Sequence, residues 1–133
     1  MMATKTRPCD ERTRTGRLRK ANEFYDAAQL IRRYATSDEE LANAFVTLCI
    51  HAGIAAADVI CCRALSKHAQ GEDHKEAVGL LRSATPLTTL ANDLDVLLGM
   101  KTRAGYGAES VTADDRKKAY RRATNLIERA RLV

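Results

Sequence analysis

The sequence predicts an all-α fold, an antiparallel bundle of four or five helices. Alanine and leucine dominate the interior of the chain, whereas aromatic residues make up only 5% of its 133 residues and tryptophan is absent. Alanine and leucine lose little conformational freedom in a helix, while strands favour β-branched and aromatic side chains. Five segments repeat apolar residues at helical spacing, and none shows strand-like alternation. The length suits one domain.

The first helix is expected over about 18–35. Residues 1–17 are basic and lack the apolar run of a signal peptide, so we expect a flexible arm there and a single bundle domain over 18–133. The apolar face of the first helix recurs every three or four positions: Leu18, Ala21, Tyr25, Ala28, Ile31 and Ala35.

The second helix is predicted to be the longest element. It opens with "SDEE", in which Ser37 and Glu40 match a capping box, and it continues to about Lys67. Its segment 41–65 is the most apolar of the chain but carries polar and charged residues. Because charges are costly in a bilayer, we expect a buried core helix and no membrane span.

Four polar residues of this helix, Asn43, Thr47, His51 and Asp58, lie within about 80° of one another on a helical wheel. They predict a buried polar stripe, at a dimer seam or in a binding cleft. A stripe that faces solvent or is satisfied by internal hydrogen bonds is the alternative. The small residues of "HAGIAAAD", 51–58, would let another helix approach closely, from this chain or a second copy.

Three further helices complete the predicted bundle. "QGED", 70–73, is read as a turn and cap before a helix over 74–84, and Pro86 suits the first turn of a helix over 86–100. "AGYGAES" ends that helix. Thr112 then caps the last helix, whose first turn holds two aspartates.

The charge distribution is bipolar. The first 20 residues carry a net charge of +5, residues 116–133 carry +6, and residues 21–115 carry −6. Basic ends are typical of proteins that bind nucleic acid, an acidic partner or a second copy, and equally of a solvated surface. Tyr106, between two glycines, either stacks on a base or packs into the bundle. The candidate RNA or partner contacts are Lys101, Arg103, Tyr106, Arg121 and Arg122.

The cysteines predict neither a metal site nor a disulfide. Cys9 stands alone, no C-x-x-C occurs, and adjacent Cys61 and Cys62 point to different faces of a helix. Reduced thiols, including Cys49, are typical of a cytoplasmic protein. No glycine-rich phosphate loop or Ser-His-Asp set is present, so no cofactor is expected.

From the second helix onward, the order of features resembles the HEPN superfamily of small helical bundles. The resemblance rests on "CIHAGIAAADVICCRAL", "EDHKEAVGLL" and "LLGMKTRAGYGAESVTADDRKKAYRRATNLIERA", which together cover about 42–130. It implies a homodimer that acts beside a nucleotidyltransferase or an antitoxin, in bacterial toxin–antitoxin, defence or stress systems. Many members of the superfamily are metal-independent RNases.

The chain departs from the RNase motif of that superfamily, an arginine followed after four to six residues by a histidine and often x-Tyr. Counting back from Tyr106 places Ala104 at the histidine position and Gly99 at the arginine position, and neither can do the chemistry. The chain therefore resembles branches with a non-histidine loop. Arg63 and His68 match the spacing elsewhere, at the end of the second helix.

These observations favour a dimeric, HEPN-like binding or scaffold module without catalysis of its own, acting with a partner protein or RNA. The alternative is a metal-independent RNase toxin that uses the displaced pair Arg63 and His68. A DNA-associated regulator using the basic last helix is a third hypothesis.

Overall fold

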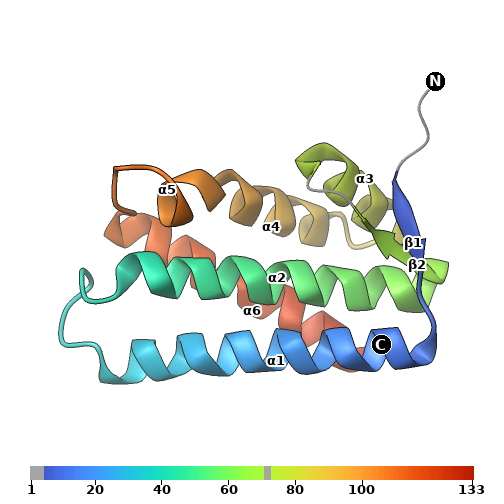
Figure 1. The fold of residues 1–133 in the computed structure, drawn as a ribbon, viewed down its shortest axis with the longest axis horizontal. Helices are drawn as coiled ribbons and strands as arrows, with labels where there is room; N and C mark the ends of the chain where they lie inside the picture. Colours follow the sequence, from blue (N-terminus) through green and yellow to red (C-terminus); the bar gives the residue numbers. More distant parts are fainter. Residues whose placement is uncertain (1–4, 71–72) are drawn as a thin grey trace.

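The computed structural model describes residues 5–70 and 73–133 and confirms the all-α bundle (Figure 1). Five long helices, one short helix and two three-residue strands occur within these residues. Their order is β1 (Thr6–Pro8), α1 (Glu11–Tyr34), α2 (Ala42–Leu65), β2 (Lys67–Ala69), α3 (His74–Ala84), α4 (Thr88–Gly99), α5 (Lys101–Gly105) and α6 (Ala113–Leu132).

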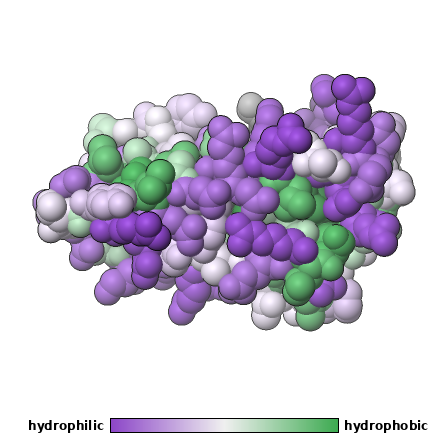
Figure 2. All heavy atoms as spheres, turned by 90° about the horizontal axis from the view of Figure 1, so that it is seen from below, coloured by the Kyte–Doolittle hydropathy of each residue, from purple (hydrophilic) through white to green (hydrophobic). Residues whose placement is uncertain are grey.

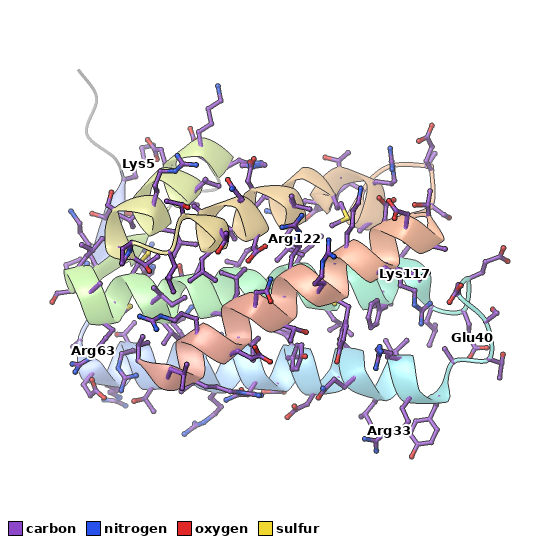
Figure 3. The ribbon with its side chains drawn as sticks, turned by 180° about the vertical axis from the view of Figure 1, so that it is seen from behind. Lys5, Arg33, Glu40, Arg63, Lys117 and Arg122 are labelled. Atoms are coloured by element: carbon purple, nitrogen blue, oxygen red, sulfur yellow. A yellow bond between two sulfur atoms is a disulfide. The ribbon has the colours of Figure 1, made fainter. Side chains whose placement is uncertain are left out.

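Helix α2 is the centre of the bundle. It lies beside α1, α4 covers it on the other side, and α6 crosses diagonally behind it, as the view from behind shows (Figures 1 and 3). By length and composition α2 could cross a membrane, with a mean hydropathy of 2.0 over its most apolar window. Yet 78% of that window is buried inside the bundle, which is the pattern of a core helix.

The small residues of α2 let two helices approach it closely, as the sequence predicted. A Cβ added at Gly53 would overlap Cδ1 of Leu97 from α4 and would lie 3.3 Å from Cδ1 of Leu126 from α6. Both leucines are fully buried. The close approach therefore comes from helices of this chain.

Most helix positions agree with the sequence pattern, and a first difference lies at the amino terminus. Helix α1 begins at Glu11, capped by Asp10, whose side chain accepts a hydrogen bond from the Thr13 amide at 2.8 Å. Residues 11–17, expected in the flexible arm, are thus helical. Thr112 and Asp115 form a reciprocal capping box on α6, and Asp73 caps α3. Residues 71 and 72 of the expected turn lie outside the described residues.

The capping box expected at Ser37 is wrong. Helix α2 begins only at Ala42, after Leu41 in a left-handed conformation with φ of 54° and no side-chain cap. The Glu40 carboxylate instead accepts a hydrogen bond from the Thr36 hydroxyl at 2.7 Å. The Arg116 guanidinium of α6 donates to the carbonyl oxygens of Asp38 and Glu40, which fastens this loop to α6.

The expectation of four reduced thiols is also wrong, because a disulfide joins Cys9 to Cys62, 53 positions later. Strand β1 pairs antiparallel with β2, with Arg7 opposite His68, and this pairing brings the chain before α1 back to the end of α2. Cys61 points elsewhere, as expected for adjacent residues of a helix, and remains a free thiol with Cys49. Disulfides are typical of oxidising compartments, and the cytoplasmic location stays a prediction.

The disulfide should contribute strongly to stability. Closing a loop of this length restricts the unfolded chain by about 4 kcal/mol in the chain-entropy account. We expect Cys9→Ser to lower the free energy of unfolding, measured in urea, by a large part of that amount. With a reducing agent the variant and the wild type should unfold alike. Four reactive thiols in unfolded, unreduced wild-type protein would contradict the bond.

Two glycine substitutions test the close packing against α2. Gly53→Ala should lower the free energy of unfolding by about 1–3 kcal/mol, because the buried Leu97 side chain must shift within a packed core. Gly79→Ala is the matched control: its Cβ would meet nothing within 4 Å. It should stabilise the protein by about 0.5–1 kcal/mol through helix propensity. Equal effects of the two substitutions in thermal unfolding would refute the packing account.

Candidate functional site

All three histidines of the chain line one cleft. The cleft has a volume of about 360 Å³ and lies among α1, α2, α3, α4, β2 and the start of α5. We call it the histidine cleft. Its polar and charged lining residues are Arg17, His51, Asp58, His68, Gln70, Asp73, His74 and Lys101.

The deepest charged group of the cleft is the Asp58 carboxylate. Arg17 of α1 donates to Asp58 Oδ2 from Nη2 at 2.7 Å and from Nε at 3.0 Å. The Asp58 residue is only 9% exposed, so burial raises the pKa of its carboxyl, while the Arg17 charge and then His68 act in the opposite direction. The pair holds the first helix against α2 at the floor of the cleft.

His68 lies on β2 beside this pair. Its Nδ1 is 4.0 Å from Asp58 Oδ1 and 2.9 Å from the carbonyl oxygen of Ala69. Because a carbonyl oxygen only accepts, Nδ1 carries the hydrogen in that contact. In the neutral ring, Nε2 is then left as the basic nitrogen.

His51 lies on α2, with its ring centroid 5.4 Å from that of Phe24. Partial burial lowers the pKa of His51, and the positive charges of Lys101 and Arg17 lower it further. The ring is therefore neutral at pH 7 and can accept a proton or a hydrogen bond. Lys101, the first residue of α5, brings an ammonium group to the same cleft.

The third histidine links α3 to α4. His74 opens α3, and its Nε2 lies 2.6 Å from Asp95 Oδ1 of α4. The pair is half exposed, with the carboxylate the more accessible partner. Asp73, which caps the same helix, adds a carboxylate to the rim.

The rest of the wall is apolar. It is formed by residues of α2, α3 and α4, among them Ile54, Ala57, Leu94 and Leu98. Cys61 also lines the cleft, and burial raises the pKa of its thiol to about 12, so the sulfur is protonated and is no nucleophile at neutral pH. Within residues 5–70 and 73–133, no three His, Cys, Asp or Glu side chains are placed to hold a metal ion.

The predicted polar stripe of α2 is divided by the structure. Only Asp58 is buried, His51 is exposed, and both line the cleft. Asn43 serves the fold instead: its Oδ1 accepts from the Val111 amide at 2.9 Å, which fastens the segment before α6. Thr47 is half-buried and lies outside the cleft. The expectation of a buried stripe is thus correct for Asp58 alone.

The displaced pair Arg63 and His68 is not brought together in the cleft. His68 lines it, whereas Arg63 is exposed near the end of α2 and is not part of the lining (Figure 3). The arginine that shares a partner with His68 is Arg17, through Asp58. Sequence reasoning missed Arg17 because it assigned residue 17 to a flexible arm.

The five candidate contact residues are scattered. Lys101 lines the histidine cleft, while Arg103 pairs with Asp115 at 3.1 Å. Tyr106 is 79% exposed, so the expectation that it packs into the bundle is wrong. Its stacking on a base stays a prediction, as do contacts of exposed Arg121.

Arg122 has a structural partner. Its Nη1 donates at 2.8 Å to the carboxylate of Asp93, which is 1% exposed on α4. Asn125 donates to the other oxygen of that carboxylate at 3.3 Å. The pair joins α4 to α6, so Arg122 is engaged inside the bundle.

Comparison with known proteins adds no relative: no protein family, curated protein or solved structure compared with the chain matches it. The resemblance to the HEPN superfamily therefore stays a prediction. The cleft has to be interpreted from its own chemistry.

Substituting Arg17 should reveal how much free energy it costs to bury the Asp58 carboxylate without a counter-charge. We expect Arg17→Met to lower the free energy of unfolding at pH 7 by about 2–4 kcal/mol, because Asp58 loses its counter-charge. Without the cation, the pKa of Asp58 rises further in the folded state. As the pH falls, Asp58 of the folded variant therefore takes up a proton before the unfolded chain does, which removes the unpaired buried charge, so the loss of stability should shrink toward pH 4.

The control is the double variant Arg17→Met with Asp58→Asn, which removes both charges. Urea unfolding across pH 4–7 should show most of the stability regained. A loss in Arg17→Met that is independent of pH and is not recovered in the double variant would contradict this pairing.

Proposed function

We propose that the protein is a binding module, without catalysis of its own, that holds an RNA nucleotide in the histidine cleft. The observation that carries the proposal is the convergence of three histidines, Lys101 and Arg17 from five separate elements on one partly apolar cleft. Ligand sites are typically concavities of roughly 300–1,000 Å³ with apolar walls and a few convergent polar groups.

The composition of the cleft suits the parts of a nucleotide. The apolar residues Ile54, Leu94 and Leu98 offer a surface on which a base can lie. The Lys101 ammonium, beside neutral His51, can bind a phosphate group. The carboxylate of Asp73 can accept a hydrogen bond from a sugar hydroxyl or the base.

The partners of this module follow from the predicted resemblance. A HEPN-like homodimer that acts beside a nucleotidyltransferase or antitoxin would use the cleft to hold RNA.

The α1 face is mainly hydrophilic, with hydrophobic side chains in separate patches (Figure 2). Exposed Leu30 and Tyr34 lie on α1. Sedimentation equilibrium tests the dimer, and a monomer at micromolar concentration would refute it.

A specific observation favours one second candidate, an RNase that uses the same cleft. His51 is neutral by its lowered pKa and can act as a base, while His68 is oriented by the Ala69 carbonyl beside the Arg17–Asp58 pair. Two histidines in different environments are the pattern of an acid–base pair. In this candidate RNase, Arg17 takes the role that the sequence predicted for Arg63.

Calorimetric titration with uridine 3′-monophosphate tests the binding proposal. Lys101→Met should weaken binding by about tenfold, since a charge-assisted contact is lost. The matched control is Arg103→Gln, which removes a neighbouring cation of α5 outside the cleft. Absence of binding to the wild type, or equal effects of both substitutions, would refute the proposal.

The same variants separate the two candidates when they are incubated with a labelled single-stranded RNA. A binding module should leave the RNA intact. Cleavage that is abolished in both His51→Ala and His68→Ala, but kept in Arg63→Gln, would establish the RNase instead.

A further inference from the structure

A second cleft lies on the other side of the bundle, and it shares no residue with the histidine cleft. It has a volume of about 510 Å³ and lies between the end of α1, the 35–38 segment and the first turns of α6. Figure 3 shows this region around Lys117, where α6 passes the start of α2. We call it the α6 cleft.

The α6 cleft collects positive charge. Arg32, Arg116 and Lys117 line it, against the single carboxylate of Asp38. Within residues 5–70 and 73–133, no ion pair to a carboxylate involves any of these three cations. Other cations of α6 do have such partners, as Lys118 has in Asp114 and Arg122 in Asp93. The cleft therefore has a surplus of uncompensated charge.

Arg116 is the most informative of these cations. It is only 8% exposed, and its Nη1 donates to the carbonyl oxygens of Asp38 and Glu40, each at 2.9 Å. Its guanidinium carbon lies 4.8 Å from the centroid of the Phe45 ring. These contacts fix the group without neutralising it. A buried charge held only by neutral groups is costly, and an anion in the cleft would offset that cost.

The neighbouring cation is positioned in the same way. The Arg32 guanidinium lies 4.5 Å from the centroid of the Tyr120 ring, so an aromatic face holds it at the rim. Lys117 is exposed and free to turn toward a ligand. The Ser37 hydroxyl adds a neutral donor to the same wall. Two guanidinium groups, an ammonium and a hydroxyl form a donor set that suits the oxygens of a phosphate.

From this arrangement we propose that the α6 cleft is a phosphate-binding site, separate from the histidine cleft. The phosphate belongs either to a small phosphorylated molecule or to the backbone of single-stranded RNA. The proposal goes beyond the proposed function, since it needs no ligand in the histidine cleft.

Titrations followed by amide NMR, with three probes, test the proposal. The probes are inorganic phosphate, adenosine monophosphate and a six-nucleotide oligouridylate. At least one should saturate and shift the amides of Ser37 and Lys117. Tightest binding of the monophosphate identifies a small molecule as the source, and tightest binding of the oligonucleotide, with strong salt dependence, identifies RNA.

Lys117→Gln and Arg32→Gln should each weaken that binding by about fivefold to tenfold, because each removes one cation from an exposed position. Arg121→Gln is the matched control, since Arg121 is an exposed cation one turn further along α6, outside the cleft. Arg116→Lys keeps the charge but loses the fork of donors, and it should also bind more weakly.

Any of three results would overturn the proposal. They are that no probe saturates at millimolar concentration, that Arg121→Gln weakens binding as much as Lys117→Gln, or that the amide shifts occur mainly at His51 and Lys101. The last result would contradict a phosphate site in the α6 cleft but would support ligand binding in the histidine cleft, so the experiment distinguishes the two proposals.

Discussion

The packing of small residues along α2 is the constraint on which the rest of the structure depends. Gly53 lets Leu97 of α4 and Leu126 of α6 pack against the backbone of α2, which positions both helices. The same helix carries His51, Asp58 and Cys62. A shift of α2 would therefore change the core, the cleft and the disulfide together. The core of the bundle and its candidate site therefore depend on the position of the same helix.

The histidine cleft combines features that cost stability. A buried carboxylate, an arginine that compensates it and three imidazole rings line one cleft, where a wholly apolar lining would be more stable. The short sheet that carries His68 is tied by the Cys9–Cys62 bond, because three-residue strands alone are marginal. The molecule thus keeps a polar site beside α2, where stability alone would favour apolar packing.

The sequence predicted the helices well because each has an apolar face at helical spacing. The helix over 74–84 and the cap at Thr112 coincide with the structure. Spacing along one helix also indicated that His51 and Asp58 share a face. It could not show that Arg17, His68 and His74, from three other elements, join them, because that depends on tertiary packing.

The main errors concern the amino terminus. A basic composition suggested an arm, whereas a three-residue strand and a disulfide fix this end to the bundle. Such short pairing has no periodic signal, and the partner of Cys9 lies 53 positions away. Tyr106 was misjudged for a related reason: glycine neighbours leave open whether a loop folds inward, and this one leaves the ring in solvent.

The central claim is that the histidine cleft is a ligand site. NMR spectra of the three imidazole rings during titration with uridine 3′-monophosphate test it most directly, since every histidine of the chain lines the cleft. Resonances of His51, His68 and His74 should shift together along one binding curve. Rings that keep their positions while the nucleotide saturates elsewhere, or that respond with unrelated affinities, would contradict it.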